Sequence, residues 1–226
     1  MVLRIGHRGA RGYEPENTIL SFKKALELNV DMVEFDVCRC KSGEIVVFHD
    51  KRVDKLTNDT GYVQEKTFEE LRSYDIGKGQ KIMSLQEALD FLDRKIKVNI
   101  EVKGENMAEC LFSVLTHYVK EKKWSWDNFI ISSFNHYELL AFKRLTAEVK
   151  IGAIIAGIPI GYAECAAKIN AYSLHVSKEF INQALVDDAH NRGMKVFVYT
   201  PNAPEDIEKM KSMRVDGIFS DFPDRI

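Results

Sequence analysis

Apolar residues fall into short runs that alternate with amphipathic stretches along the chain. Runs that are apolar almost throughout, such as residues 97–102 and 150–155, predict strands of a parallel sheet whose two faces are both covered. Between these runs, apolar residues recur at helical spacing, as in residues 17–29, where Asn17 or Thr18 can cap the helix. The pattern therefore predicts strands and helices in strict alternation.

The complete pattern gives eight predicted strands that alternate with seven predicted helices. The predicted strands cover residues 2–6, 32–37, 97–102, 129–132, 150–155, 172–176, 195–199 and 217–219. The predicted helices cover residues 17–29, 84–92, 107–120, 136–145, 161–168, 178–192 and 204–213. The strand-like run at 45–48 and the polar, turn-rich residues 50–80, with a short helical piece at 68–71, belong to an insertion at about residues 39–83, after the second strand.

Eight parallel units that close on themselves form a (β/α)8 TIM barrel, and 226 residues are near the usual size. We therefore predict an α/β fold with residues 1–226 as one domain. The alternative is an open, doubly wound sheet, which needs a glycine-rich phosphate loop after a strand. The only comparable turn, Gly6-His7-Arg8-Gly9, carries two large polar side chains instead.

Composition narrows the possible partners. A net charge of −2 without blocks of like charge argues against a general nucleic-acid surface. No apolar run approaches the ~20 residues that span a bilayer, and the N-terminus lacks the pattern of a secretion signal. We expect a cytoplasmic protein without stable membrane association. Cys38 and Cys40 do not have zinc-ribbon spacing, so they and Cys110 and Cys165 are interpreted as ordinary thiols.

Ionisable residues gather where predicted strands end. Because the C-terminal ends of barrel strands carry the chemistry, these side chains are expected to meet at one rim. They are His7 and Arg8 after the first strand, Glu34 and Asp36 in the second, His49 after the return run, and Glu101 and Lys103 at the third.

The three carboxylates have two interpretations. Glu34, Asp36 and Glu101 form an oxygen-only set without a thiolate, which suits Mg²⁺, Ca²⁺ or Mn²⁺. The alternative is that Glu34 and Glu101 only form ion pairs with Arg8 and Lys103. The sequence leaves both open.

The cationic and imidazole side chains suggest phosphate chemistry. Arg8 offers a planar fork and Lys103 a point charge, and both suit a phosphate group. His7 and His49 have the pKa range for proton transfer near neutral pH, although a histidine in a strand is more often structural. We expect His175 to be structural. No G-x-S-x-G elbow is present, so an esterase of that type is unsupported.

At these residues the sequence resembles the glycerophosphodiester phosphodiesterase family, in order over essentially the whole chain. The matching segments are His7-Arg8-Gly9, Pro15-Glu16-Asn17-Thr18, Glu34-Phe35-Asp36-Val37, Val47-Phe48-His49-Asp50, Glu101-Val102-Lys103, Ser133-Phe134, Tyr199-Thr200-Pro201-Asn202, Asp216-Gly217-Ile218 and Ser220-Asp221-Phe222-Pro223.

The resemblance implies a TIM barrel that hydrolyses a glycerophosphodiester to sn-glycerol 3-phosphate and an alcohol. It implies that Glu34, Asp36 and Glu101 bind one divalent cation, usually Ca²⁺ or Mg²⁺. It also implies that His7 and His49 are the general acid and base, without saying which is which, and that Arg8 and Lys103 contact the phosphate. Phe134 and Tyr199 are expected to contact the substrate; Tyr199 stands where the family frequently has tryptophan.

Two other functions compete with this one. A lysophospholipase D acting on single-chain lipids would need an apolar groove at the rim, and we rank it lower because no amphipathic membrane-binding segment is evident. A catalytically silent barrel that binds a phosphate ligand would lack a histidine or an acidic ligand, and here all are present.

Overall fold

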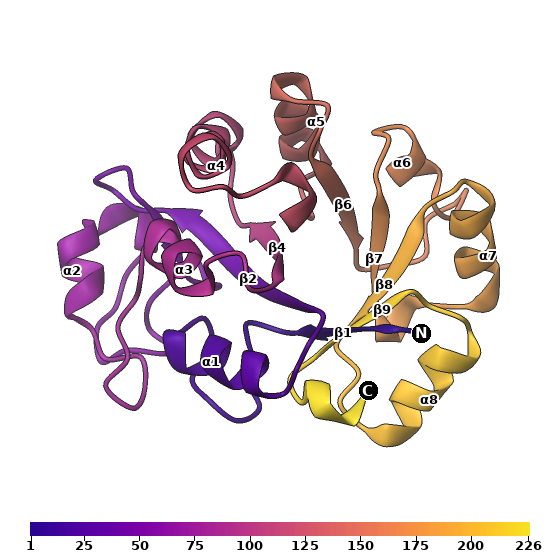
Figure 1. Cartoon of the computed structure of the whole chain (residues 1–226), viewed down its shortest axis with the longest axis horizontal. Coiled ribbons are helices and arrows are strands. Elements are labelled where there is room, and N and C mark those ends of the chain that lie inside the picture. The colour runs from indigo at the N-terminus through magenta and orange to yellow at the C-terminus, as the bar shows by residue number, and fades with distance from the viewer.

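The computed structural model describes residues 1–226, and it confirms the predicted barrel. Eight parallel strands are hydrogen-bonded in the order β1-β9-β8-β7-β6-β5-β4-β2, and pairing of β1 with β2 closes the ring. Figure 1 shows the helices outside these strands. The barrel strands are β1 (Leu3–Gly6), β2 (Met32–Arg39), β4 (Lys97–Val102), β5 (Phe129–Ser133), β6 (Lys150–Ile155), β7 (Ser173–Ser177), β8 (Lys195–Tyr199) and β9 (Gly217–Ser220).

Each predicted helix has a counterpart between the barrel strands, although the one predicted at 161–168 is reduced to four residues. These helices are α1 (Ile19–Glu27), α3 (Leu85–Leu92), α4 (Ala108–Glu121), α5 (His136–Leu145), α6 (Glu164–Ala167), α7 (Gln183–Asn191) and α8 (Pro204–Ser212). Short 3-10 turns cover Trp126–Asn128, Lys178–Phe180 and Pro223–Arg225. No helix is both long and apolar enough to cross a membrane.

Asparagines and threonines set two helix ends that the apolar pattern placed differently. The helix predicted at 178–192 is wrong as one element: Asn182 is extended and its side chain accepts a hydrogen bond from the backbone N–H of Leu185, so α7 begins only at Gln183. Thr18, one of the two predicted caps, caps the first helix, and Asn17 has a left-handed backbone (φ 57°), so α1 begins at Ile19 and not at residue 17. The Ser84 capping box forms as predicted.

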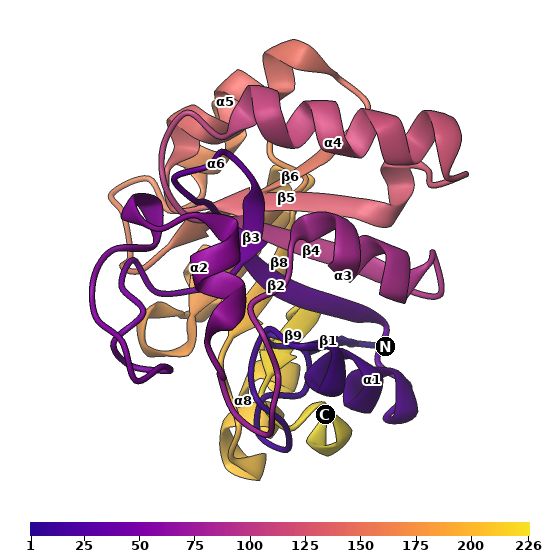
Figure 2. The same ribbon diagram turned by 90° about the vertical axis from the view of Figure 1, so that its left-hand side faces the viewer.

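The segment between β2 and α3 packs beside the barrel. It contains β3 (Ile45–Val47), antiparallel to β2, a 3-10 turn at Val63–Glu65, and α2 (Phe68–Ser73). Figure 2 shows β3 and α2 together at one side of the barrel. A separate apolar cluster that includes Val46, Phe48 and Leu71 holds this segment together. His49 and Asp50, which follow β3, are therefore attached to a packed segment.

The barrel interior is apolar at one end and polar at the other. Met32 lies two residues before Glu34 on β2, so their side chains share the inner face with Met32 nearer the N-terminal end. Met32 packs with Ile5, Ile130, Phe197 and Phe219 into a closed apolar layer. Polar side chains are consequently confined to the C-terminal half of the interior.

Candidate active site

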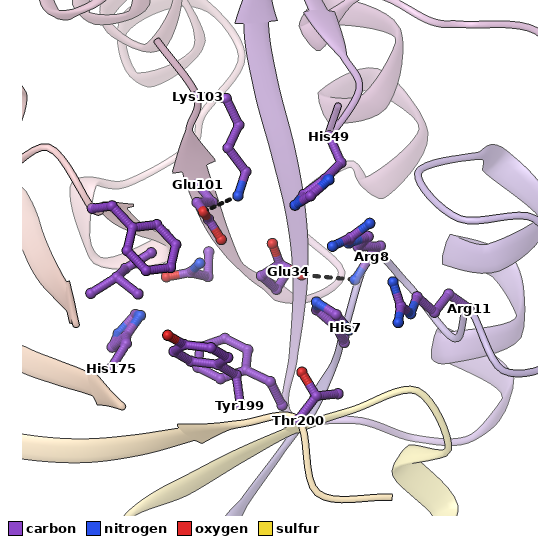
Figure 3. A pocket seen from close by; sticks show the side chains of 14 residues that line it. His7, Arg8, Arg11, Glu34, His49, Glu101, Lys103, His175, Tyr199 and Thr200 are labelled. Atoms are coloured by element: carbon purple, nitrogen blue, oxygen red, sulfur yellow. Dashed lines mark hydrogen bonds and ion pairs between the residues drawn. The ribbon is translucent and has the colours of Figure 1, made fainter. Parts of the chain in front are cut away.

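A cavity of about 240 Å³ lies at the C-terminal ends of the strands. Figure 3 shows its labelled side chains converging from several strands. Eight of the nine predicted site residues line it: His7, Arg8, Glu34, His49, Glu101, Lys103, Phe134 and Tyr199. The ninth, Asp36, is buried and contacts Arg8 and Lys103. The structure thus brings the whole predicted set to one place.

A tight turn after β1 presents His7 and Arg8. Arg8 has a left-handed backbone (φ 51°), and Gly9 follows with φ 81°. A Cβ on Gly9 would lie 2.4 Å from the Ser21 hydroxyl oxygen, so only glycine lets the turn approach α1 this closely. The backbone N–H of Arg8 donates to Glu34 Oε2 at 2.7 Å. The turn therefore joins the first strand end to the carboxylates of the second.

The carboxylates of Glu34, Asp36 and Glu101 form an acidic cluster. Glu34 and Asp36 share the inner face of β2, and Asp36 is in register with Glu101 on β4. One ligand oxygen from each residue lies within 4.8 Å of the others. Glu34 Oε1 is buried without a hydrogen-bond partner. An oxygen-only set that contains an unpartnered buried oxygen fits a divalent cation.

Arg8 and Lys103 contact the same cluster, so ion pairs form as well. Lys103 pairs with Glu101 and lies 3.3 Å from Asp36. The Arg8 guanidinium lies 3.3 Å from Asp36 and 2.6 Å from Glu16, rather than pairing with Glu34 as the ion-pair alternative supposed. When ionised, the three carboxylates carry three negative charges, and Arg8 and Lys103 carry two positive charges. The cluster therefore favours a further positive charge.

The electrostatic environment shifts the pKa values of the three carboxylates in different directions. Burial, together with Asp36 and Glu101, raises the pKa of Glu34 well above its usual value. Burial and Asp36 raise the pKa of Glu101 to about 7. Burial acts in the same direction on Asp36, but Lys103 and Arg8 outweigh it and lower that pKa. Lys103 and Arg8 therefore favour the ionised form of Asp36, whereas burial and the neighbouring carboxylates disfavour that of Glu34.

Each predicted catalytic histidine is held by a carboxylate through Nδ1. His7 Nδ1 lies 2.7 Å from Asp221 Oδ1, and His49 Nδ1 lies 2.5 Å from Asp50 Oδ1. With Nδ1–H donating to the carboxylate, Nε2 of each neutral imidazole is left as a proton acceptor. Burial lowers the pKa of His7 and of His49, against the upward effect of their carboxylate partners. Figure 3 places the two rings on either side of Glu34.

Two aromatic side chains form one wall of the cavity. The rings of Phe134 and Tyr199 meet edge to face with centroids 6.2 Å apart. Lys103 Nζ lies 5.5 Å from the centre of the Phe134 ring. The Tyr199 hydroxyl donates to the backbone carbonyl of Ile155 at 2.9 Å, which fixes the ring at the edge of the cavity.

His175 has the surroundings of a structural residue, although it also lines the cavity. Its Nε2 lies 2.8 Å from the Ser173 hydroxyl, and its ring packs against Phe197 and Phe219. No carboxylate contacts it, and burial lowers its pKa to about 3. It is therefore neutral throughout the physiological pH range.

Sequence reasoning gave no role to several polar residues of the site. Asp221 was noted only within a matching segment, and Arg11 lies two residues beyond the His7-Arg8-Gly9 motif. Arg11 donates to Asp221 at 2.7 Å, and Asn17 donates to Asp36 at 3.0 Å. Asn99 could have been found, because it lies two residues before Glu101 and so shares its face of the strand.

Comparison with known proteins identifies the family. The model of the glycerophosphoryl diester phosphodiesterase family matches residues 7–225. The chain belongs to this family. A glycerophosphodiester phosphodiesterase of Caldanaerobacter subterraneus subsp. tengcongensis is 37% identical over 233 residues, which cover 99% of this chain and 96% of that protein.

More distant members of the family are also similar over nearly the whole chain. A phosphodiesterase of Oleispira antarctica, solved in complex with the product sn-glycerol-3-phosphate, superposes with a TM-score of 0.90 at 29% identity, over 98% of this chain and 94% of that chain. A lysophospholipase D of Homo sapiens is 23% identical over 264 residues, or 98% of this chain and 84% of that protein. These relatives are phosphoric diester hydrolases, and this chain shares their family.

Proposed function

We propose that this enzyme hydrolyses glycerophosphodiesters to sn-glycerol 3-phosphate and an alcohol by acid–base catalysis with His7 and His49. The observation that carries the proposal is the pair of carboxylate-held imidazoles beside Arg8, Lys103 and the acidic cluster in one cavity. The product named in the Oleispira antarctica complex supports this substrate class.

The two imidazoles supply the two proton transfers that the reaction needs. One Nε2 accepts the proton of the attacking hydroxyl, which belongs to water or to the neighbouring glycerol hydroxyl. The other imidazole, in its protonated form, donates to the oxygen of the departing alcohol. Asp221 and Asp50 stabilise the imidazolium form and keep each ring in the tautomer that directs Nε2 into the cavity.

Arg8 and Lys103 are proposed to bind the phosphate. Both line the cavity, and both are charged at any physiological pH, since the neighbouring carboxylates raise their pKa values against the opposing effect of burial. Two fixed cations stabilise the additional negative charge that the phosphoryl oxygens carry in the transition state. Phe134 and Tyr199 are proposed to pack against the glycerol carbons.

Glu34, Asp36 and Glu101 are proposed to hold one divalent cation, which would be Mg²⁺, Ca²⁺ or Mn²⁺. Support comes from the unpartnered Glu34 Oε1, the all-oxygen donor set and the spacing within 4.8 Å. When bound, such an ion would supply further positive charge beside the phosphate. The cytoplasmic location and the single-domain organisation stay predictions from the sequence.

The decisive experiment is product formation from glycerophosphocholine. We expect stoichiometric release of glycerol 3-phosphate, read by a coupled dehydrogenase assay. We also expect a chelator to reduce the rate at least a hundredfold and added Mg²⁺, Mn²⁺ or Ca²⁺ to restore it. Indifference to the chelator would remove the cation from the proposal, and absence of glycerol 3-phosphate from every glycerophosphodiester tested would overturn the function.

A further inference from the structure

One guanidinium group in the cavity has no part in the proposed phosphate and cation sites. Arg11, in the loop after β1, lines the cavity, and its side chain is 29% exposed. Figure 3 shows His7 between Arg11 and Glu34, so Arg11 lies on the side of His7 that faces away from the acidic cluster. This position favours a role towards His7 over a role towards the cation.

Arg11 and His7 contact the same oxygen atom of Asp221. Arg11 Nε donates to Asp221 Oδ1 at 2.7 Å, and His7 Nδ1 lies 2.7 Å from that oxygen. The other oxygen, Oδ2, accepts from Asn202 Nδ2 at 2.8 Å. Of these two partners of the carboxylate, Arg11 is charged and Asn202 is neutral. Because charge-assisted hydrogen bonds are roughly twice as strong as neutral ones, Arg11 supplies the stronger restraint on Asp221.

The backbone next to Arg11 is docked on the segment that carries Asp221. The N–H of Gly12 donates to the backbone carbonyl oxygen of Asp221 at 2.9 Å. A Cβ on Gly12 would lie 2.4 Å from Cε1 of the Phe222 ring, so only glycine allows the loop to approach the end of β9 this closely. The contact between these two segments therefore keeps Arg11 within reach of Asp221.

Glu16 holds another nitrogen of the same guanidinium. Arg11 Nη1 donates to Glu16 Oε2 at 3.4 Å, and Glu16 Oε1 accepts from Arg8 Nη1 at 2.6 Å. The Glu16 side chain is only 14% exposed. The donors of a guanidinium form a rigid, planar fork, so partners on both Nε and Nη1 fix its orientation. Arg11 is thus a fixed donor to Asp221 and not a mobile surface charge.

We propose that Arg11 is a positioning residue: it holds the Asp221 carboxylate in the orientation that directs the His7 imidazole into the cavity. The inference rests on the proposed function, because His7 is one of the two proposed catalytic imidazoles. Arg11 acts through Asp221 and not by contact with the substrate. Without Arg11, the carboxylate keeps only Asn202 as a side-chain partner besides His7, so the carboxylate and the imidazole both gain rotational freedom.

Arg11→Met tests this role, because methionine keeps an extended side chain without a charge or an N–H donor. With Mg²⁺ present and glycerophosphocholine as substrate, we expect kcat to fall about tenfold and KM to change less than about twofold. The reason is that a misaligned imidazole slows the reaction without weakening substrate binding. Arg11→Lys keeps a charged donor but not the fork, and its kcat should fall only about threefold. The coupled dehydrogenase assay for glycerol 3-phosphate measures both.

A double substitution shows whether Arg11 acts through Asp221. Asp221→Asn alone should lower kcat about a hundredfold. Adding Arg11→Met to that variant should lower kcat by less than a further factor of about two, whereas independent effects would multiply to about a thousandfold.

Lys78→Met is the matched control for the loss of a cation near this loop. Lys78 Nζ lies 2.7 Å from Glu14 Oε2, three residues beyond Arg11, and its side chain is 57% exposed. Its replacement removes an ion pair of the same loop that has no contact with Asp221. We expect kcat and KM within about twofold of the wild type, because exposed ion pairs contribute little. Thermal unfolding of all variants shows that they remain folded.

The possible failures are distinguishable. A rise in KM of about tenfold at unchanged kcat overturns the proposal and assigns Arg11 to substrate binding. Near-normal activity of Arg11→Met, or effects of Arg11→Met and Asp221→Asn that multiply, also overturns it, while release of glycerol 3-phosphate by the wild type leaves the proposed function standing. Absence of release by the wild type from every glycerophosphodiester tested overturns the proposed function and this inference together.

Discussion

The two histidine–carboxylate pairs of the site are built in different ways. His7 and Asp221 come from the ends of β1 and β9, and their side chains are only 13% and 11% exposed. Asp221 also accepts hydrogen bonds from Arg11 at 2.7 Å and from Asn202 at 2.8 Å. His49 and Asp50 are neighbours in the sequence, and their side chains are 29% and 26% exposed. The only other ion pair of Asp50 is with Lys55, at 3.9 Å.

The two imidazoles are therefore held by their carboxylates with different rigidity. The barrel itself holds the His7 pair, whereas the inserted segment carries the His49 pair at the edge of the cavity. A buried carboxylate with several partners restrains an imidazole more firmly than an exposed one. We infer that His7 has little freedom and that His49 can adjust to the substrate.

The largest effects should come from removing either imidazole. His7→Ala and His49→Ala should each lower kcat for glycerophosphocholine by 10²–10⁴-fold, because each removes one proton transfer. Thermal unfolding near the wild-type temperature would show that the barrel is intact. Near-normal activity in both variants would refute the assignment of the two histidines.

Replacing the aspartate of each pair should show the difference in rigidity between the two pairs. Asp221→Asn should lower kcat by about a hundredfold, since it disturbs a buried, multiply bonded partner. Asp50→Asn should lower kcat by about tenfold, because solvent can replace much of the more exposed hydrogen bond. Equal losses in both variants would contradict the difference in restraint.

The same two variants should reveal which histidine is the base. Each carboxylate raises the pKa of its imidazole, so its removal should lower that pKa. The variant whose acid limb in the kcat/KM profile moves to lower pH has altered the base, and the variant whose alkaline limb moves to lower pH has altered the acid. Unmoved limbs in both would mean that the aspartates act on structure alone.

The smallest effect on activity should come from replacing His175, which has no carboxylate partner. Its replacement should instead change how stability depends on pH. The folded-state pKa of His175, about 3, lies below the unfolded value near 6.5. Below that pH the unfolded chain binds an extra proton, so this residue lowers the free energy of unfolding by about 1.4 kcal/mol per pH unit as the pH falls from 6 towards 3.

The control for this effect is a residue that does not titrate. His175→Gln should show a shallower loss of stability between pH 6 and pH 4 in chemical denaturation, with kcat at neutral pH changed less than in any variant above. An identical pH dependence in the wild type and the variant would show that other groups dominate acid unfolding.

The barrel could be predicted because its eight apolar runs are local features of the sequence. Seven of the nine predicted site residues could be placed at one rim because they lie in or just after a predicted strand, whereas Phe134 and Tyr199 came from the family resemblance. The helix at 178–192 was wrong because the apolar spacing continues across Asn182, where side-chain capping prevails. Asp221 was missed as the partner of His7 because the pairing depends on β1 lying beside β9, across 214 residues.

The pairing of β1 with β9 also links the chemistry to the order of synthesis. The acidic cluster, both imidazoles and the two cationic side chains that we propose to bind phosphate are all present in a chain translated as far as Lys103. Such a chain still lacks Asp221 and the strand that places it beside His7. Since proteins are made from the N-terminus, the nascent enzyme holds most of its reactive groups long before it can orient one of its two imidazoles. The pairing of β9 with β1 is therefore needed before Asp221 can hold the His7 imidazole in place.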